Sequence, residues 1–276
     1  MNPADKQNPS DMVSTSCSVH TPTRRLFLFR GMAGAAAVLC ATRSGVAKAK
    51  SNIASCVLSR EQTVGPYYLD AMRVRRDLTE GKPGLPLKLR LTVVDASRCL
   101  PVQNAAVDVW HCDALGIYSG ITADSPGGPP GREHDNTTFL RGVQLTDGAG
   151  IVEFSTIFPG WYESRDVHIH VRIHVGGSIT DARYGGGHIA YTGQLFFDED
   201  ITDAVALHEP YADHDVTRTR QHEDEVFVTQ HGSGSMLALT QMNERSIEDG
   251  FIATAVLGID PNAVTSSLIL KTSLIT

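Results

Sequence analysis

From residue 87 onward, apolar and polar residues alternate with the two-residue period of β-strands. Residues 87–93 show this most clearly, because leucine or valine occupies every odd position and lysine, arginine or threonine every even one. Shorter apolar segments follow, separated by turns rich in glycine and proline. These segments lie at 105–110, 142–146, 151–157, 167–175, 194–197, 235–240 and 251–259.

The connections between these segments indicate the fold class. Asp147-Gly148-Ala149-Gly150 separates residues 142–146 from 151–157, and its turn-forming composition predicts a β-hairpin. Helical signal is scarce, and only residues 201–208 have the spacing for about two helical turns. The sequence therefore predicts an all-β protein: a β-sandwich of mostly antiparallel strands, with an irregular N-terminal arm, long loops and little helix.

The first 49 residues have the order of an export signal. Arg24 and Arg25 precede the apolar residues 26–29 and a run of small and apolar residues at 31–41, and an Ala-x-Ala cleavage site ends at Ala49. Residues 23–28 resemble a twin-arginine signal, which predicts export of the folded protein to the periplasm or the exterior by the twin-arginine machinery. The apolar run is too short for a stable membrane span, so we expect none in the mature chain. An uncleaved amphipathic anchor is the alternative.

The rest of the chain divides by composition. Residues 50–86 contain Gly65-Pro66, Pro83-Gly84 and Pro86 and are expected to form the irregular arm, through which two subunits of a homodimer would pair. Residues 87–260 form the predicted sandwich, and 261–276 a C-terminal tail. The loop at 121–141 holds too many prolines and glycines for a helix or an interior strand, and we expect it to form a pocket wall.

Composition and charge narrow the function classes. The 276 residues are 41% hydrophobic and 20% charged, as in soluble globular proteins. The formal net charge is -7, and no long basic run lies outside the N-terminus, so a nucleic-acid partner is not expected. After signal removal Cys56, Cys99 and Cys112 remain. An oxidising compartment permits one disulfide among them, and the sequence does not choose the pair.

Residues 167–175 carry the strongest chemical signal. An apolar residue occupies every odd position, so His168, His170, Arg172 and His174 share the opposite face of the predicted strand. Two imidazoles two residues apart on a strand lie close enough to bind one metal ion, and histidine is the commonest metal ligand. Histidines on a solvated strand face are the alternative. The segment just upstream favours a metal site, because it brings a tyrosine and an arginine next to the pair.

Several motifs occur together with this histidine pair. They are Gly65-Pro66-Tyr67-Tyr68, Val109-Trp110-His111-Cys112-Asp113-Ala114-Leu115-Gly116-Ile117-Tyr118-Ser119, Pro159-Gly160-Trp161-Tyr162, Arg165 three residues before His-x-His, and Gln194 before Leu195-Phe196-Phe197. Taken together they resemble the intradiol ring-cleavage dioxygenases, the family of catechol and protocatechuate dioxygenases. The resemblance covers most of residues 56–200. Val64 departs from it, because an acidic residue is common at that position.

The resemblance implies a cofactor and a set of site residues. It places the ligands of a non-haem iron(III) ion on Tyr118, Tyr162, His168 and His170. Phenolate oxygens are hard, anionic donors that stabilise the ferric state. The resemblance implies that substrate displaces Tyr162 and that Arg165 stabilises negative charge on the substrate. It also implies that Gln194 donates a hydrogen bond beside the cavity. Trp110 is expected to pack in the core or at its rim. The rings of Tyr67 and Tyr68 are expected to pack on the sandwich, with an aromatic wall of the site as the alternative.

The implied reaction inserts O2 into a catechol-type ring between its two hydroxylated carbons and yields a muconate-type dicarboxylic acid. The partners would be a small aromatic diol and O2, in the catabolism of aromatic compounds. Two other functions remain open: a zinc or copper site on His168 and His170 with different chemistry, and an exported β-sandwich module that binds its ligand without reaction. The sequence does not identify the catechol.

Overall fold

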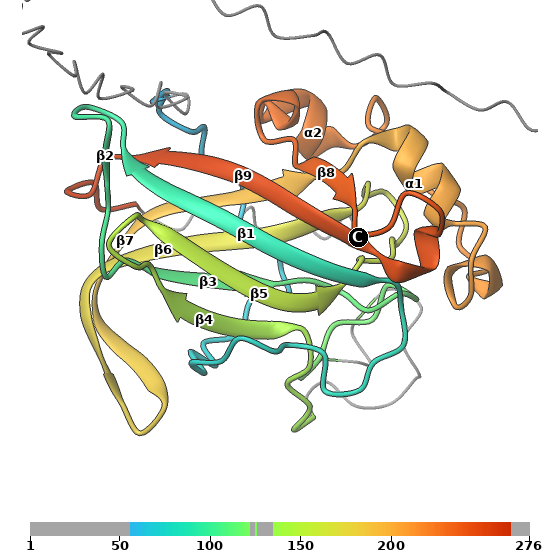
Figure 1. Cartoon of the computed structure of the whole chain (residues 1–276), viewed down its shortest axis with the longest axis horizontal. Helices are drawn as coiled ribbons and strands as arrows, with labels where there is room; N and C mark the ends of the chain where they lie inside the picture. Colours follow the sequence, from blue (N-terminus) through green and yellow to red (C-terminus); the bar gives the residue numbers. More distant parts are fainter. Residues whose placement is uncertain (1–55, 122–124, 126–134, 266–276) are drawn as a thin grey trace, which may run out of the picture. The chain divides into compact units, whose positions relative to one another are not determined.

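The computed structural model of the chain describes residues 56–121, 125 and 135–265. The predicted export signal, most of the loop at 121–141 and most of the C-terminal tail therefore lie outside the described residues. Within the described part, nine strands form two sheets that enclose a common apolar core, with only short helices (Figure 1). The predicted all-β sandwich is confirmed.

The first sheet is built around β1 (Pro86–Asp95). This strand pairs antiparallel with β5 (Ile151–Ile157) and, at its end, with β2 (Leu100–Pro101). On its other side it pairs in parallel with β9 (Phe251–Ile259), which pairs antiparallel with β8 (Ala238–Gln241). The strand order is thus β2 and β5, then β1, β9 and β8.

The second sheet carries the predicted histidines. Its order is β4 (Arg141–Leu145), β3 (Ala106–Trp110), β6 (His168–Thr180) and β7 (Arg183–Phe196), and all pairs are antiparallel. β6 and β7 are joined by a turn in which Asp181 and Ala182 have φ of 50° and 58°. Two central residues with positive φ match the twist of a tight hairpin. The yellow end of this hairpin extends beyond the other strands in Figure 1.

The prediction that residues 142–146 and 151–157 pair as a hairpin is wrong. β4 pairs with β3 in the second sheet, whereas β5 pairs with β1 in the first. The turn itself forms as predicted, because the Asp147 carboxylate accepts hydrogen bonds from the backbone N–H groups of Ala149 and Ile151, both at 2.9 Å. Its direction is set by β1: the Val93 N–H donates to the Gly150 carbonyl at 2.7 Å. The chain therefore crosses from one sheet to the other.

Apolar side chains at alternate strand positions fill the core between the sheets. Because successive strand residues point to opposite faces, this core forces the even-numbered residues at the start of β6 to the outer side of the second sheet. The core includes Leu87, Leu89, Leu91, Val107, Val109, Phe154, Ile169, Val171, Ile173 and Phe251.

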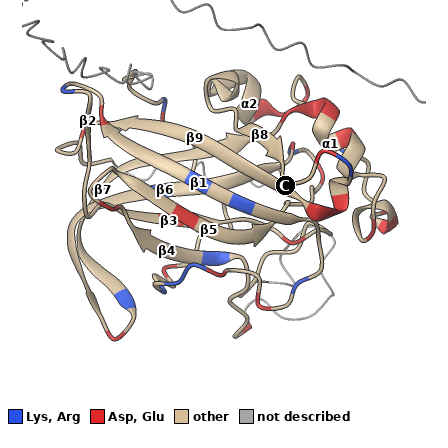
Figure 2. Ribbon diagram, viewed as in Figure 1, with Lys and Arg blue, Asp and Glu red and all other residues tan. Residues whose placement is uncertain are grey.

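The helices are short and follow β7. α1 (Glu199–Val205) overlaps the predicted helix at 201–208 and is capped by Asp198, while α2 (Glu225–Thr229) is capped by Asp224. Acidic residues also occupy the first turn of each helix, where they complement the helix dipole (Figure 2). Three 3₁₀ turns complete the described helices: η1 (Tyr211–Asp213), η2 (Gly232–Gly234) and η3 (Ile247–Asp249). Among the described residues, no helix is long and apolar enough to cross a bilayer.

The described part of the arm, residues 56–85, contacts both sheets through isolated β-bridges. Leu58 pairs with Gly258 of the first sheet, and Val74 pairs with Val143 of the second.

A disulfide joins Cys56 to Cys99 with their Cα atoms 5.3 Å apart, and Cys112 is a buried free thiol. The structure thus supplies the pairing that the sequence left open.

Candidate metal centre

The two predicted histidine ligands lie side by side on the outer face of β6. Ile169 and Val171 enter the core, so His168 and His170 point the other way. Both are buried, with exposures of 2% and 0%, and their Nε2 atoms are 3.1 Å apart. The alternative of two solvated surface histidines is therefore wrong. The arm covers His170, because a Cβ on Gly65, where φ is +70°, would lie 3.1 Å from His170 Cε1.

The protonation of these imidazoles suits metal binding. The Nδ1 atom of His168 is 2.6 Å from the Asp166 carbonyl oxygen, which only accepts hydrogen bonds, so Nδ1 carries the proton. The lone pair is then on Nε2, toward His170. Burial holds the pKa of His168 well below 6.5, and the charge of Arg165 adds to this effect. Burial, and then His168, likewise depress the pKa of His170. Both rings are neutral near pH 7.

The two predicted tyrosine ligands reach the same place from separate loops. The Tyr162 hydroxyl is 3.3 Å from His168 Nε2. The Tyr118 ring centroid lies 5.9 Å from that of Tyr162 and 6.3 Å from that of His170. All four side chains that the sequence singled out are thus brought together. Among the described residues, no three His, Cys, Asp or Glu side chains form a metal-binding group, and the tyrosines are what extend the histidine pair to four donors.

This donor set fits a cation. The Tyr118 hydroxyl is buried without a hydrogen-bond partner among the described residues, which is rare for a buried polar atom. Burial raises the pKa of Tyr118 well above 10 and also raises that of Tyr162, although Arg165 opposes the rise at Tyr162. A bound cation reverses this effect, because its charge stabilises phenolate and its empty orbitals accept the lone pairs.

A hydrogen-bonded arginine borders the centre. The Arg165 Nη1 atom lies 3.5 Å from the Tyr162 hydroxyl, and Nη2 donates to Gln194 Oε1. Gln194, which is opposite His170 in the β6–β7 ladder, donates from Nε2 to the Thr63 carbonyl at 2.9 Å. Its amide is thereby oriented with the oxygen toward Arg165. The predicted hydrogen-bond donor therefore donates to the arm, and it accepts from the arginine.

The carboxylate of Asp224 holds Arg165 from the other side. Arg165 Nε lies 3.1 Å and 3.2 Å from its two oxygens. The same carboxylate accepts from the backbone N–H of Asp166 at 2.9 Å and from those of Val226 and Phe227 at the start of α2. Burial keeps this ion pair away from water, since Asp224 is fully buried and the Arg165 side chain is 13% exposed.

Comparisons with known proteins identify the family. The family model described as Dioxygenase matches residues 63–206. An intradiol ring-cleavage dioxygenase from Tetranychus urticae is 32% identical, with a TM-score of 0.65. The match covers 76% of this chain and 98% of the Tetranychus chain. This chain belongs to the intradiol ring-cleavage dioxygenases. A second solved dioxygenase, also 32% identical, gives a TM-score of 0.66 over 77% of this chain and 98% of its own. A comparison with curated proteins gives no match.

As an intradiol ring-cleavage dioxygenase, the chain is an oxidoreductase of a family that generally depends on non-haem iron(III). A more distant match is the dioxygenase domain of a fusion with a carbohydrate-binding protein from Streptomyces sp. SirexAA-E. It is 22% identical, with a TM-score of 0.49 over 73% of this chain and 97% of its own. The family model and the two structures that are 32% identical confirm, at the level of the family, the resemblance read from the motifs.

Three residues of this dioxygenase site were missed or were expected mainly to pack. The Tyr67 ring stacks on Tyr118, with centroids 4.6 Å apart, and Trp110 stacks on His170 at 4.8 Å with an interplanar angle of 2°. Both therefore contact predicted ligands directly. Asp224 lies 59 residues after Arg165, and its only sequence signal is that of a helix N-cap.

Proposed function

We propose that this dioxygenase binds iron(III) through Tyr118, Tyr162, His168 and His170 and cleaves a catechol-type ring between its two hydroxylated carbons. The product would be a muconate-type dicarboxylic acid. The observation that carries the proposal is the convergence of two phenols and two neutral imidazoles in one buried cluster. Two hard oxygen donors and two nitrogen donors suit a ferric ion. When bound, that ion would supply Lewis acidity that favours deprotonation of the substrate hydroxyls and activates the ring.

The surrounding residues prepare this site for an anionic substrate. The Asp166 carbonyl fixes the tautomer of His168, so that its lone pair faces the centre. The guanidinium of Arg165 lies beside the Tyr162 hydroxyl, where it favours negative charge on that oxygen and on substrate oxygens placed there. We assign Tyr162 as the ligand that withdraws when substrate binds, its oxygen taking up a proton from a substrate hydroxyl. Tyr67 excludes water on the Tyr118 side.

We also propose that the enzyme is exported. The predicted twin-arginine signal and cleavage near Ala49 motivate this, and the Cys56–Cys99 disulfide supports it, since disulfides persist mainly in oxidising compartments. Expression of the full chain followed by fractionation tests it. We expect mature protein in the periplasm or medium, and substitution of Arg24 and Arg25 by lysine should retain the precursor in the cytoplasm. Export unchanged by those substitutions would contradict the proposed route.

The proposed iron site is tested by colour and metal content. Tyrosinate bound to iron(III) absorbs visible light, so the purified protein should be reddish and its band should shift when catechol is added. Tyr118→Phe should lose most of the band and much of the iron. Tyr191→Phe is the matched control, because Tyr191 is equally buried but donates to the Arg60 carbonyl, away from the centre.

The same preparation separates the alternatives. A zinc or copper site on the histidine pair would keep its metal content in Tyr118→Phe, and a binding module would be colourless and metal-free after folding with iron supplied. Either result contradicts the proposal. Oxygen uptake with catechol, protocatechuate, hydroxyquinol and chlorinated catechols would then identify the substrate, because each reaction consumes one O2 per ring opened.

A further inference from the structure

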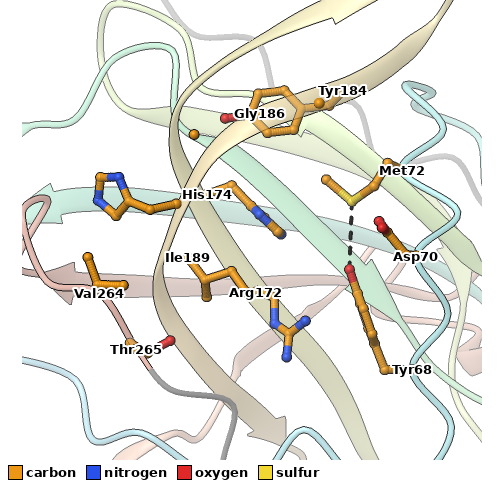
Figure 3. Close-up of a pocket in the computed structure, with 13 residues that line it drawn as sticks. Tyr68, Asp70, Met72, Arg172, His174, Tyr184, Gly186, Ile189, Val264 and Thr265 are labelled. Carbon is orange, nitrogen blue, oxygen red and sulfur yellow. Dashed lines mark hydrogen bonds between the residues drawn. The ribbon is translucent and has the colours of Figure 1, made fainter.

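A cavity of about 560 Å³ lies further along the face of β6 that holds the histidine pair (Figure 3). Arg172 and His174, the next two residues on that face, line it together with Tyr68 and Asp70 of the arm. None of the four proposed iron ligands does. A volume of this size is ordinary for a small-molecule site.

The cavity is separated from the metal centre by aromatic side chains. Arg172 is two residues beyond His170, which corresponds to about 7 Å along a strand. Trp110 stacks on His170 with one side and meets the edge of Tyr68 at 4.8 Å between centroids. A molecule in the cavity therefore lies beside the centre, behind the wall that Trp110 and Tyr68 form.

A fixed cation forms one wall of the cavity. The Arg172 side chain is nearly buried, and its Nε donates to Thr192 Oγ1 at 3.2 Å. Its guanidinium carbon lies 4.2 Å from the centroid of the Tyr68 ring. Stacking and hydrogen bonding hold the planar group in one orientation, which is how arginine recognises carboxylates.

Two unpartnered polar atoms belong to residues that line the same cavity. His174 is 8% exposed, and its Nε2 has no hydrogen-bond partner among the described residues. Thr265 Oγ1 is also buried without a partner there. Both atoms are covered in this conformation, so the two residues make this side of the cavity polar without offering these atoms to a ligand.

The remaining lining suits a hydroxylated ring. The Tyr184 ring meets His174 edge-on, with centroids 5.8 Å apart, and Met72 accepts a hydrogen bond from the Tyr68 hydroxyl at 3.7 Å. Aromatic rings and a thioether pack well against an aromatic ligand. The Asp70 side chain adds a hydrogen-bond acceptor.

We propose that this cavity binds a phenolic carboxylate, a planar ring that carries one acid group and one hydroxyl. The acid group pairs with Arg172, the ring packs against Tyr184, and the hydroxyl donates to Asp70. The site is separate from the metal centre and does not require the ring-cleavage reaction.

The probe for this proposal is 4-hydroxybenzoate, which has only one hydroxyl and cannot chelate iron as a catechol does. Calorimetric titration of the iron-loaded protein under anaerobic conditions, with 4-nitrocatechol saturating the centre, should give one binding event per chain. Benzoate, which lacks the hydroxyl, and 4-hydroxybenzyl alcohol, which lacks the acid, should each bind at least about tenfold more weakly. Absence of binding, or its loss when 4-nitrocatechol is present, would overturn the proposal.

Gly185→Leu tests the location. Gly185 lines the cavity and a Cβ there meets nothing within 4 Å, so leucine fills the space without strain. We expect at least a tenfold loss of 4-hydroxybenzoate affinity, with catechol turnover unchanged as evidence of an intact fold. Thr180→Leu, which adds the same side chain at an exposed position of the same hairpin, should bind as wild type does. Equal affinity in Gly185→Leu and Thr180→Leu refutes the assignment. If Gly185→Leu weakens 4-hydroxybenzoate binding and Thr180→Leu does not, in a protein that turns over no catechol, the cavity is upheld. Only the proposed reaction is then refuted.

Discussion

Asp224→Asn tests whether the proposed catalytic arginine depends on a buried carboxylate for its position. Asp224 accepts hydrogen bonds from Arg165, from the Asp166 backbone and from two N–H groups of α2. Asparagine has nearly the same shape but one acceptor oxygen instead of two. If that oxygen caps α2, the amide NH2 takes the place of the other oxygen. It then faces the Asp166 N–H and Arg165 Nε, of which only Nε keeps an acceptor, at 3.2 Å.

The cost follows from the burial of the pair. Removal of one partner of a buried ion pair typically destabilises a protein by about 3–5 kcal/mol. Since Arg165 is partly exposed and asparagine retains the cap, we expect about 2 kcal/mol for Asp224→Asn. Asp224→Ala also loses the N-cap and should cost about 1 kcal/mol more. Urea unfolding of the two variants beside wild type measures both values.

The effect on activity should be larger than the loss of folded protein explains. A displaced Arg165 stabilises developing charge less well, so kcat should fall about tenfold to a hundredfold under conditions where the variant remains folded. KM should change little if the arginine acts mainly on the reacting state. Steady-state oxygen uptake with a catechol substrate gives both constants.

A double-mutant cycle decides whether Asp224 acts through Arg165. Arg165→Gln removes the group that Asp224 positions, so adding Asp224→Asn to it should lower kcat no further. Multiplicative losses in the double variant would refute the reasoning, because they would show that Asp224 affects catalysis independently of the arginine.

Three further predictions follow from other contacts. Gly65→Ala places a Cβ 3.1 Å from His170 Cε1 at a φ of +70°, so iron affinity should fall about tenfold in a chelator competition; unchanged affinity would show that the arm moves freely. Burial raises the pKa of Asp108 from 3.8 to about 7, so wild-type stability falls as pH rises through that interval. Asp108→Asn removes this dependence, so the Tm of the variant should exceed that of wild type by more near pH 8 than near pH 5. A Tm difference that stays constant with pH would contradict this prediction. The Cys56–Cys99 disulfide closes a loop with a sequence separation of 43, so Cys56→Ser with Cys99→Ser should lose up to about 4 kcal/mol in urea unfolding, and reduced wild type should lose the same.

β1, the start of β6 and the histidine pair were predictable because a strict period controls them, whereas most of β7 was not predicted. Leucine at alternate positions of β1 leaves only one way to bury that strand, and β1 begins one residue from its predicted start. The same rule places His168 and His170 on one face. Tyr118 and Tyr162 follow no period of this kind. Their place in the site was predicted from the resemblance of motifs, since loops converge through contacts that are distant in sequence.

The wrong hairpin shows the limit of local turn chemistry. The residues around Asp147 specify that the chain turns, and the turn forms as predicted. They do not specify which strand the next segment pairs with. That choice depends on β1, which lies more than 50 residues upstream and gives β5 seven residue pairs. A non-local partner of this kind leaves no mark within the turn itself.

The arm explains why a polar strand face becomes a site. His170 and Arg172 lie on the outer side of their sheet, yet both are almost fully buried. The covering groups come from the arm, where Gly65 approaches His170 and Tyr68 stacks on Arg172. A sheet face with four polar residues would otherwise be solvated, and its charges would interact weakly in water. Covered by the arm, the same face offers neutral imidazoles at one end and a fixed guanidinium at the other, so one irregular segment creates the conditions for both the metal centre and the neighbouring cavity.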